Sequence, residues 1–166
     1  MGAPMVARLL EAGFSLTLWN RTPAKAQVFS GRARLASSPA EAVAGADVVI
    51  TMLESGQVVD QVLYQSGAIR QLRQGALVID MSSIEPGLAR GHGAQVEALG
   101  GGYLDAPVSG GTRGAQAGTL SIMAGGSDET FVRAAAVFQP LGTVTHIGPV
   151  GSGQLAKLAN QAIVGI

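Results

Sequence analysis

The sequence contains no cysteine, only two lysines and two histidines, and 4% aromatic residues, and its 11 basic residues are balanced by 11 acidic ones. Without cysteine, the chain can form neither a disulfide framework nor a thiolate metal site. The two separate histidines, His92 and His146, do not make a metal site, and we interpret both as structural or surface residues. A net charge of zero without a basic run argues against nucleic acid as a partner.

Long apolar runs are absent as well. No stretch approaches the roughly 20 apolar residues that a membrane-spanning helix needs. The segment Met1–Val6 lacks the basic stretch followed by an apolar stretch that marks a signal peptide. We therefore expect a cytoplasmic protein without a membrane partner. With 47% hydrophobic and 13% charged residues, the 166 residues suffice for one globular domain, or for one domain and the start of another.

Short β-branched runs alternate along the chain with alanine-rich stretches. The expected strands are Ser15–Trp19, Asp47–Met52, Ala76–Met81, Tyr103–Pro107, Thr119–Ala124 and Thr143–Ile147. The expected helices are Ala3–Ala12, Ala24–Phe29, Pro39–Val43, Gly56–Leu63, Pro86–Leu99 and Asp128–Phe138. Ser38–Glu41 has the pattern of a capping box. The alternation predicts an α/β fold, a doubly wound and mostly parallel sheet of the Rossmann type.

Both ends of this predicted fold look interrupted. The chain opens on a helix, although a doubly wound fold normally begins with its central strand, and it closes within a helix at Ile166. We expect residues 1–149 to form a dinucleotide-binding Rossmann domain that lacks its first strand. Residues 150–166 would then be the start of an interdomain helix that leads to an all-α C-terminal domain, and a fragment without that domain would be inactive.

Two polar residues stand three positions apart on one face of the helix predicted for the last segment. One of them, Lys157, lies among leucine and alanine, and the other is Asn160. A lysine that is shielded from water becomes a usable general acid near neutral pH, because desolvation disfavours its charged form. The same pattern also fits a surface lysine whose stem covers apolar neighbours.

The segment Asp105–Gly114 has the order of a strand, a proline and a glycine-rich turn. In it, Ser109, Gly110 and Gly111 would let the backbone approach an anionic ligand closely, with amide N–H groups as donors. An ordinary glycine-rich loop has the same composition.

Polar residues also follow two other strands, at the edge of an open parallel sheet where ligands bind. Asn20-Arg21-Thr22 comes after the strand Ser15–Trp19. An arginine there accommodates the 2′-phosphate of NADP, whereas an acidic residue would bind the 2′-hydroxyl of NAD, so NADP is favoured. A turn with a solvated arginine is the alternative. Ser83 is a candidate for contact with the nicotinamide ribose, for capping the helix that starts at Pro86, or for both.

Four segments together closely resemble the β-hydroxyacid dehydrogenases, which include 3-hydroxyisobutyrate dehydrogenase, tartronate semialdehyde reductase and the glyoxylate/succinic semialdehyde reductases. Met1–Met5 resembles the end of the family's Gly-x-Gly-x-Met-Gly-x-Pro-Met turn, and Asp80–Pro86 resembles its Asp-x-Ser-Thr/Ser-x-x-Pro segment. Asp105–Gly111 matches its Asp-Ala-Pro-Val-Ser-Gly-Gly motif, and Gly151–Asn160 matches its Gly-x-Gly-x-x-x-Lys-x-x-Asn motif. The sequence departs from the family where the first turn glycines are missing and where Leu53-Glu54 replaces the frequent Leu-Pro.

The resemblance implies an oxidoreductase that transfers a hydride between NADP (preferred) or NAD and a small 3-hydroxy acid, 2-oxo acid or semialdehyde. It implies that Lys157 is the general acid/base. It also implies that a small carboxylate-bearing substrate is bound by Ser109, Gly110, Gly111 and Asn160. The cofactor-binding residues that it implies are Met1, Gly2, Asn20, Arg21, Thr22, Met52, Leu53 and Ser83. It also implies a homo-oligomer at full length, and it implies no metal.

Two other functions compete with this one. The first is a non-catalytic NADP-binding or interaction module of the same superfamily. Such modules tend to replace the catalytic lysine, so the presence of Lys157 favours the enzyme. The second is chemistry of the 6-phosphogluconate type, which would need more basic residues for a phosphate than Arg113, the only one near the substrate motif.

Overall fold

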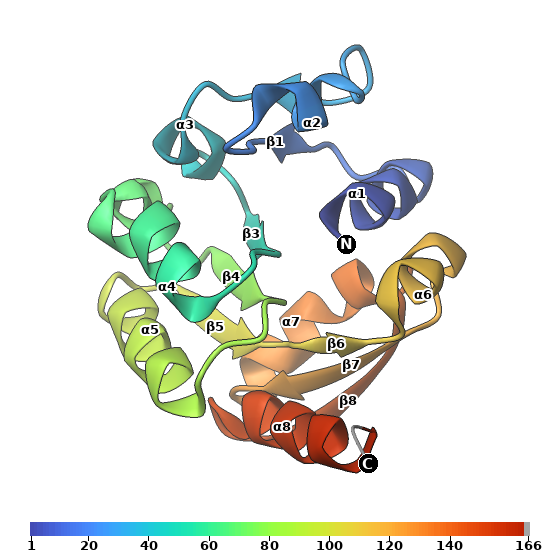
Figure 1. Cartoon of the computed structure of the whole chain (residues 1–166). Coiled ribbons are helices and arrows are strands. Elements are labelled where there is room, and N and C mark those ends of the chain that lie inside the picture. Colours follow the sequence, from blue (N-terminus) through green and yellow to red (C-terminus); the bar gives the residue numbers. More distant parts are fainter. Residues whose placement is uncertain (165–166) are drawn as a thin grey trace.

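The alternating segments form the predicted strands and helices in the computed structural model, which describes residues 1–164 (Figure 1). The strands are β1 (Thr17–Leu18), β2 (Arg34–Leu35), β3 (Val48–Thr51), β4 (Leu77–Asp80), β5 (Gly102–Asp105), β6 (Val108–Ser109), β7 (Leu120–Gly125) and β8 (Gly142–Gly148). The helices are α1 (Gly2–Glu11), α2 (Pro23–Gln27), α3 (Pro39–Val43), α4 (Gly56–Val59), the π-helix η1 (Asp60–Gln65), the 3₁₀ helix η2 (Ala68–Gln71), α5 (Pro86–Ala98), α6 (Gly111–Ala117), α7 (Asp128–Phe138) and α8 (Ser152–Val164).

The main sheet is mostly parallel, as predicted. Its strands β3, β4 and β5 are parallel neighbours, and β7 pairs in parallel with β8. The sequence did not predict that β7 runs antiparallel to β5 and β6. Both of these strands pair with β7, and Ala106 and Pro107 separate them along the chain. Pro107 interrupts the strand because proline has no N–H group to donate.

The strands β1 and β2 form a separate parallel pair. Thr17 lies opposite Arg34, and Leu18 opposite Leu35. Within residues 1–164 neither strand pairs with β3, and Figure 1 shows the ribbons of β1 and β3 set apart. This arrangement agrees with the predicted Rossmann-type fold that lacks its first strand.

Each face of the main sheet packs against its own set of helices. Side chains that alternate along a strand point to opposite faces. Leu77, Ile79 and Leu104 accordingly join a core with α1, α6 and α7. Val78 and Tyr103 join a second core with α4, η1, η2 and α5. Helices on both faces are the defining feature of the predicted doubly wound fold.

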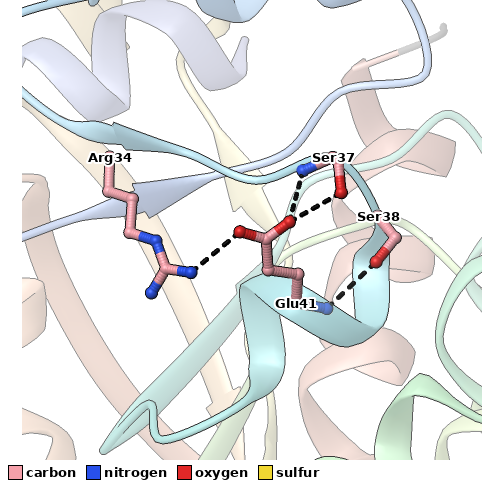
Figure 2. Close-up of polar contacts among 4 residues, drawn as sticks. All are labelled: Arg34, Ser37, Ser38 and Glu41. Atoms are coloured by element: carbon pink, nitrogen blue, oxygen red, sulfur yellow. Dashed lines mark hydrogen bonds and ion pairs between the residues drawn. The ribbon is translucent and has the colours of Figure 1, made fainter.

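The predicted capping box at the start of α3 is confirmed for its Ser38 half, whereas the Glu41 carboxylate bonds to Ser37, one residue before the N-cap; Figure 2 shows these contacts. The Ser38 hydroxyl accepts the backbone N–H of Glu41 at 3.2 Å. The Glu41 carboxylate accepts the Ser37 hydroxyl at 2.7 Å, the Ser37 backbone N–H at 2.8 Å, and Arg34 Nη2 at 2.8 Å. These hydrogen bonds lower the pKa of Glu41 to about 2, and the bond from the Ser37 hydroxyl has the largest effect. The cluster joins β2 to α3 and orients the chain that enters β3.

Two predicted elements are wrong in detail. The glycine-rich run after Ser109 forms the helix α6 rather than a loop, bounded by Gly110 and Gly118 at φ angles of +123° and +69°. The helix predicted for Gly56–Leu63 starts at Gly56, but α4 ends at Val59 and the chain continues as the π-helix η1. The two-residue strands β2 and β6 and the short helix η2 were not predicted, since such short elements have no detectable periodicity.

Within the described part of the chain, no helix is both long enough and apolar enough to cross a bilayer. The same residues contain no group of three His, Cys, Asp or Glu side chains arranged to hold a metal ion. The cytoplasmic location stays a prediction. The last predicted helix is present as α8 up to Val164, and Gly165 and Ile166 lie outside the described residues. The interdomain role of α8 stays a prediction.

Candidate functional site

The carboxyl ends of β3, β4 and β5 place three buried polar residues side by side. Thr51 lies opposite Asp80 across one ladder, and Asp80 lies opposite Asp105 across the next. All three are buried, and the Thr51 hydroxyl donates to Asp80 Oδ1 at 2.8 Å. Burial raises the pKa of Asp80, although its hydrogen bonds from Ser82 and Thr51 oppose that shift. Ligands bind at this edge in open α/β sheets.

The last of these residues, Asp105, binds the N-terminal turn of helix α8. The Asp105 carboxylate accepts the backbone N–H of Gly151 at 2.7 Å and that of Gln154 at 2.9 Å. Burial raises the pKa of Asp105 to about 6, and these two bonds only partly offset the rise. A Cβ atom on Gly153 would lie 2.3 Å from the Met123 carbonyl oxygen, so only glycine allows the helix to approach the sheet this closely.

Asn160 of α8 reaches the predicted substrate segment. Its Nδ2 lies 3.5 Å from the Ser109 hydroxyl, at the long limit for a hydrogen bond. Lys157 lies one turn earlier on the same helix and is half-buried. Leu155 and Leu158 are 55% and 52% exposed, so these leucines face solvent rather than enclose the lysine. The apolar shielding expected for Lys157 is therefore only partial.

Ser109 ends β6, and the two glycines after it turn the chain into α6. Gly110 and Gly111 have φ angles of +123° and +61°, which residues with a side chain adopt only with strain. Because α6 starts at Gly111, the N–H groups of its first turn have no partner within the helix. The predicted Ser-Gly-Gly segment therefore has the backbone shape and the donors that an anion requires.

The predicted N-terminal cofactor residues lie beside this segment. Met1 occupies the N-cap position of α1 and makes no side-chain capping bond, and Gly2 is the first helical residue. Met1 Sδ lies 3.9 Å from the Thr112 hydroxyl, so the start of α1 is close to the start of α6. The free N–H groups of the first turn of α1 are suited to a phosphate group.

Arg21 lies near the segment that follows β3. Its Nη1 is 3.9 Å from Glu54 Oε1, and the two side chains are 75% and 66% exposed. Asn20 Oδ1 accepts the backbone N–H of Thr22 at 2.9 Å, in front of α2. The type I turn that competes with the cofactor interpretation does not form, because Thr22 has extended backbone angles; the Asn20 side chain closes the bend instead, with Arg21 as an exposed cation.

The remaining predicted cofactor residues follow β3 and β4. Met52 and Leu53 are half-buried, and the Leu53 N–H donates to the Ser82 hydroxyl at 3.0 Å. Ser83 is exposed, whereas Glu85 occupies the N-cap of α5, so the predicted capping role of Ser83 is wrong. The exposed Arg21 cation and the uncapped start of α1 fit a dinucleotide, because they supply partners for its phosphate groups.

Sequence reasoning missed the buried residues that join these segments, namely Asp80, Ser82, Asp105 and Gln154. Asp80 and Asp105 follow apolar strands and open two of the matched motifs, but nothing local indicates that they or Gln154 connect the segments. The side-chain partners of Gln154 lie 70 and 72 residues earlier in the chain, a separation that no local pattern reveals.

Comparisons with known proteins identify a family for this chain. Residues 1–148 match the family described as the NAD binding domain of 6-phosphogluconate dehydrogenase. An NAD-dependent L-serine dehydrogenase of Pseudomonas aeruginosa is 40% identical over 169 residues, covering 100% of this chain and 57% of that protein. The 2-hydroxy-3-oxopropionate reductase of Escherichia coli is 38% identical over 168 residues, covering 100% and 58%.

Among solved structures, the Mycobacterium tuberculosis 3-hydroxyisobutyrate dehydrogenase with L-serine matches with a TM-score of 0.93 and 40% identity. The match covers 99% of this chain and 56% of that one. The chain thus spans just over half the length of the relatives that it matches.

Proposed function

The chain belongs to the family of the NAD-binding domain of 6-phosphogluconate dehydrogenase, and from this membership we propose that it is the cofactor-binding half of a β-hydroxyacid dehydrogenase. The predicted resemblance to that group is confirmed by relatives named for hydroxy acid dehydrogenation and oxo acid reduction. The proposed reaction moves a hydride between NADP or NAD and a small 3-hydroxy acid, 2-oxo acid or semialdehyde.

The observation that carries the proposal is the contact between α8 and the Ser-Gly-Gly segment. The 3.5 Å distance from Asn160 Nδ2 to Ser109 Oγ brings the two most specific motifs of the sequence together. The N–H groups at Gly110 and Gly111 would bind the substrate carboxylate, and Asn160 would orient the substrate.

In this proposal Lys157 transfers the proton. During oxidation the hydroxyl proton of the substrate passes to the amine of Lys157, and during reduction the ammonium returns it to the carbonyl oxygen. The nicotinamide ring, when bound, supplies the hydride chemistry. Met52, Leu53 and Ser83 would line its binding site, while Met1 and Gly2 would lie at the pyrophosphate.

NADP is the proposed preferred cofactor, with NAD as the alternative. Arg21 supports NADP, because an exposed guanidinium is a charge-assisted partner for the 2′-phosphate, and no acidic residue occupies the end of β1. Asn20 and Thr22 would shape the ribose site beside it. NAD is the alternative because the Pseudomonas relative is named as NAD-dependent.

The domain arrangement is also a proposal. Residues 1–149 would form the cofactor domain, and residues 150–166 would lead into a further, all-α domain. The 56–58% coverage of the relatives supports it. So does the exposure of Leu155, Leu158 and Ile163 on α8, which is 52% to 74%. The further domain would complete the substrate site and the homo-oligomer.

Replacement of Lys157 tests the proposed chemistry. Lys157→Ala in the full-length protein should lower turnover of 3-hydroxyisobutyrate or L-serine by roughly 10²–10⁴-fold, the usual contribution of general acid–base catalysis. Lys25→Ala is the matched control, because Lys25 is the other lysine of these 166 residues and lies exposed on α2. Initial rates of nicotinamide reduction measure both variants.

Two results would contradict the proposal. Activity of Lys157→Ala within about threefold of the control would remove the lysine from the chemistry. Cofactor binding without turnover of any small hydroxy acid would favour the non-catalytic module instead.

A further inference from the structure

Gln154, in the first turn of α8, is almost completely buried, with 1% of its surface exposed. Its side-chain amide bonds twice to the segment that follows β4. Gln154 Oε1 accepts the Ile84 N–H at 3.0 Å, and Nε2 donates to the Ser82 carbonyl at 2.9 Å. A buried amide destabilises a fold unless its polar atoms are bonded, and here both ends are bonded. The side chain is therefore held in one orientation.

The segment that Gln154 holds is joined in turn to the end of β3. The Ser82 hydroxyl accepts the Leu53 N–H at 3.0 Å, and the Ser82 N–H donates to Asp80 Oδ1 at 3.0 Å. A continuous set of hydrogen bonds thus runs from Leu53 through Ser82 to α8. Leu53 is one of the residues proposed to line the nicotinamide site.

The same turn of α8 is held from the other side by β5. The Asp105 carboxylate accepts the backbone N–H groups of Gly151 and Gln154 at 2.7 and 2.9 Å. Gln154 is therefore the point where the segment after β4 and the end of β5 both meet the helix. Lys157 follows three residues later, so its backbone position depends on this turn.

We propose that Gln154 is a positioning residue that fixes Lys157 relative to Leu53 and the segment after β4. The proposal rests on the proposed function, since it takes Lys157 as the proton donor and Leu53 as part of the cofactor site. An apolar side chain would suffice to fill the core, whereas a doubly bonded amide fixes both distance and orientation. A displacement of about 1 Å at a catalytic group costs on the order of 10²-fold in rate.

A matched pair of variants tests the proposal in the full-length protein. Gln154→Met removes both hydrogen bonds and keeps an unbranched side chain of similar length, and Gln161→Met makes the same change at an exposed position of α8. We expect Gln154→Met to lower kcat roughly 10- to 100-fold. Its dissociation constant for NADP+ should stay within about threefold of wild type, because the cofactor-binding groups remain. Gln161→Met should change neither.

Hydrogen exchange gives a second measurement that needs no turnover. In the wild type, NADP+ should slow amide exchange around Lys157, because the segment after β4 is bonded to the same turn of α8. Gln154→Met should lose this slowing and Gln161→Met should keep it. If Gln154→Met does not fold, Ser82→Ala provides the same comparison, because it removes the link to Leu53 at the other end of the connection.

The positioning role is supported if Gln154→Met, but not Gln161→Met, lowers kcat and loses the slowing of amide exchange by NADP+. Equal kcat and equal protection in the two methionine variants overturns it. Failure of the wild-type protein to bind a nicotinamide cofactor or to turn over a hydroxy acid contradicts the proposed function instead, so the two failures are distinguishable.

Discussion

The proposed preference for NADP depends on a single exposed side chain, Arg21. Arg21→Ala should narrow the preference for NADPH over NADH by about ten- to a hundredfold, since a charge-assisted hydrogen bond contributes roughly 1.5–3 kcal/mol. Glu54→Gln should widen the preference, because it removes the carboxylate 3.9 Å from Arg21 that competes with a 2′-phosphate. The ratio of kcat/KM for the two cofactors measures both effects.

Arg70→Ala is the control for this comparison, since Arg70 is an exposed arginine on η2. An NADH preference in the wild type, unchanged in Arg21→Ala, would mean that Arg21 is only a solvated turn residue.

Asp105 predicts a pH dependence of stability with a definite sign. Burial raises its pKa to about 6 from 3.8, so its contribution to stability is fully present below pH 3.8 and is lost as the pH rises through about 6. Asp105→Asn cannot titrate. The free energy of unfolding of the wild type, relative to Asp105→Asn, should therefore increase by about 2–3 kcal/mol as the pH falls across this window.

Denaturant unfolding at several pH values measures this difference. Glu97→Gln, on the exposed side of α5, serves as the control and should not show the same trend. The free energies of unfolding of wild type and Asp105→Asn could instead differ by a constant amount from pH 7 to about pH 4. That result would show that burial does not raise the pKa of Asp105.

At the scale of elements, glycines in two helices should respond to alanine in opposite ways. On Gly153 of α8, a Cβ would meet the Met123 and Asp105 carbonyl oxygens at 2.3 and 2.7 Å, and backbone atoms cannot move aside cheaply. Gly153→Ala should therefore destabilise the fold by roughly 1–3 kcal/mol. At Gly91 of α5 a Cβ meets open space, so Gly91→Ala should stabilise by about 0.5–1 kcal/mol.

Chemical denaturation of the two alanine variants gives both values. Equal stabilities would show that α8 does not pack tightly against the ends of β5 and β7.

The same elements show how far local sequence predicts structure. The buried strands β3 and β4 and the helices α3 and α7 follow from apolar periodicity and capping residues, and α3 and α7 have the predicted bounds. α6 was missed because glycine has a low helix propensity, and local sequence does not reveal its packing against β7 and α1. Periodicity also does not distinguish a π-helix from an α-helix, which explains η1.

At the scale of the whole molecule, the sequence indicates candidate site residues but not the connections among them. The spacing of Lys157 and Asn160 and the Ser-Gly-Gly motif are local features that the sequence displays. The buried bonds of Gln154 and Asp105 bring together segments that are distant along the chain, so only the folded sheet creates them. The predicted capping role of Ser83 is wrong because α5 starts at Pro86 and its N-cap is therefore Glu85.

The most direct test of the central claim follows a single hydride. The full-length protein is incubated with NADP+ and 3-hydroxyisobutyrate in which both hydrogens of the hydroxyl-bearing carbon are replaced by deuterium, and the reduced cofactor is analysed by mass spectrometry. The proposed chemistry predicts one deuterium in each reduced nicotinamide, because the hydride passes directly from substrate carbon to cofactor. Reduced cofactor without deuterium, or no reduction with this acid, with L-serine or with NAD+ in place of NADP+, would contradict the assignment of this chain to a hydroxy acid dehydrogenase.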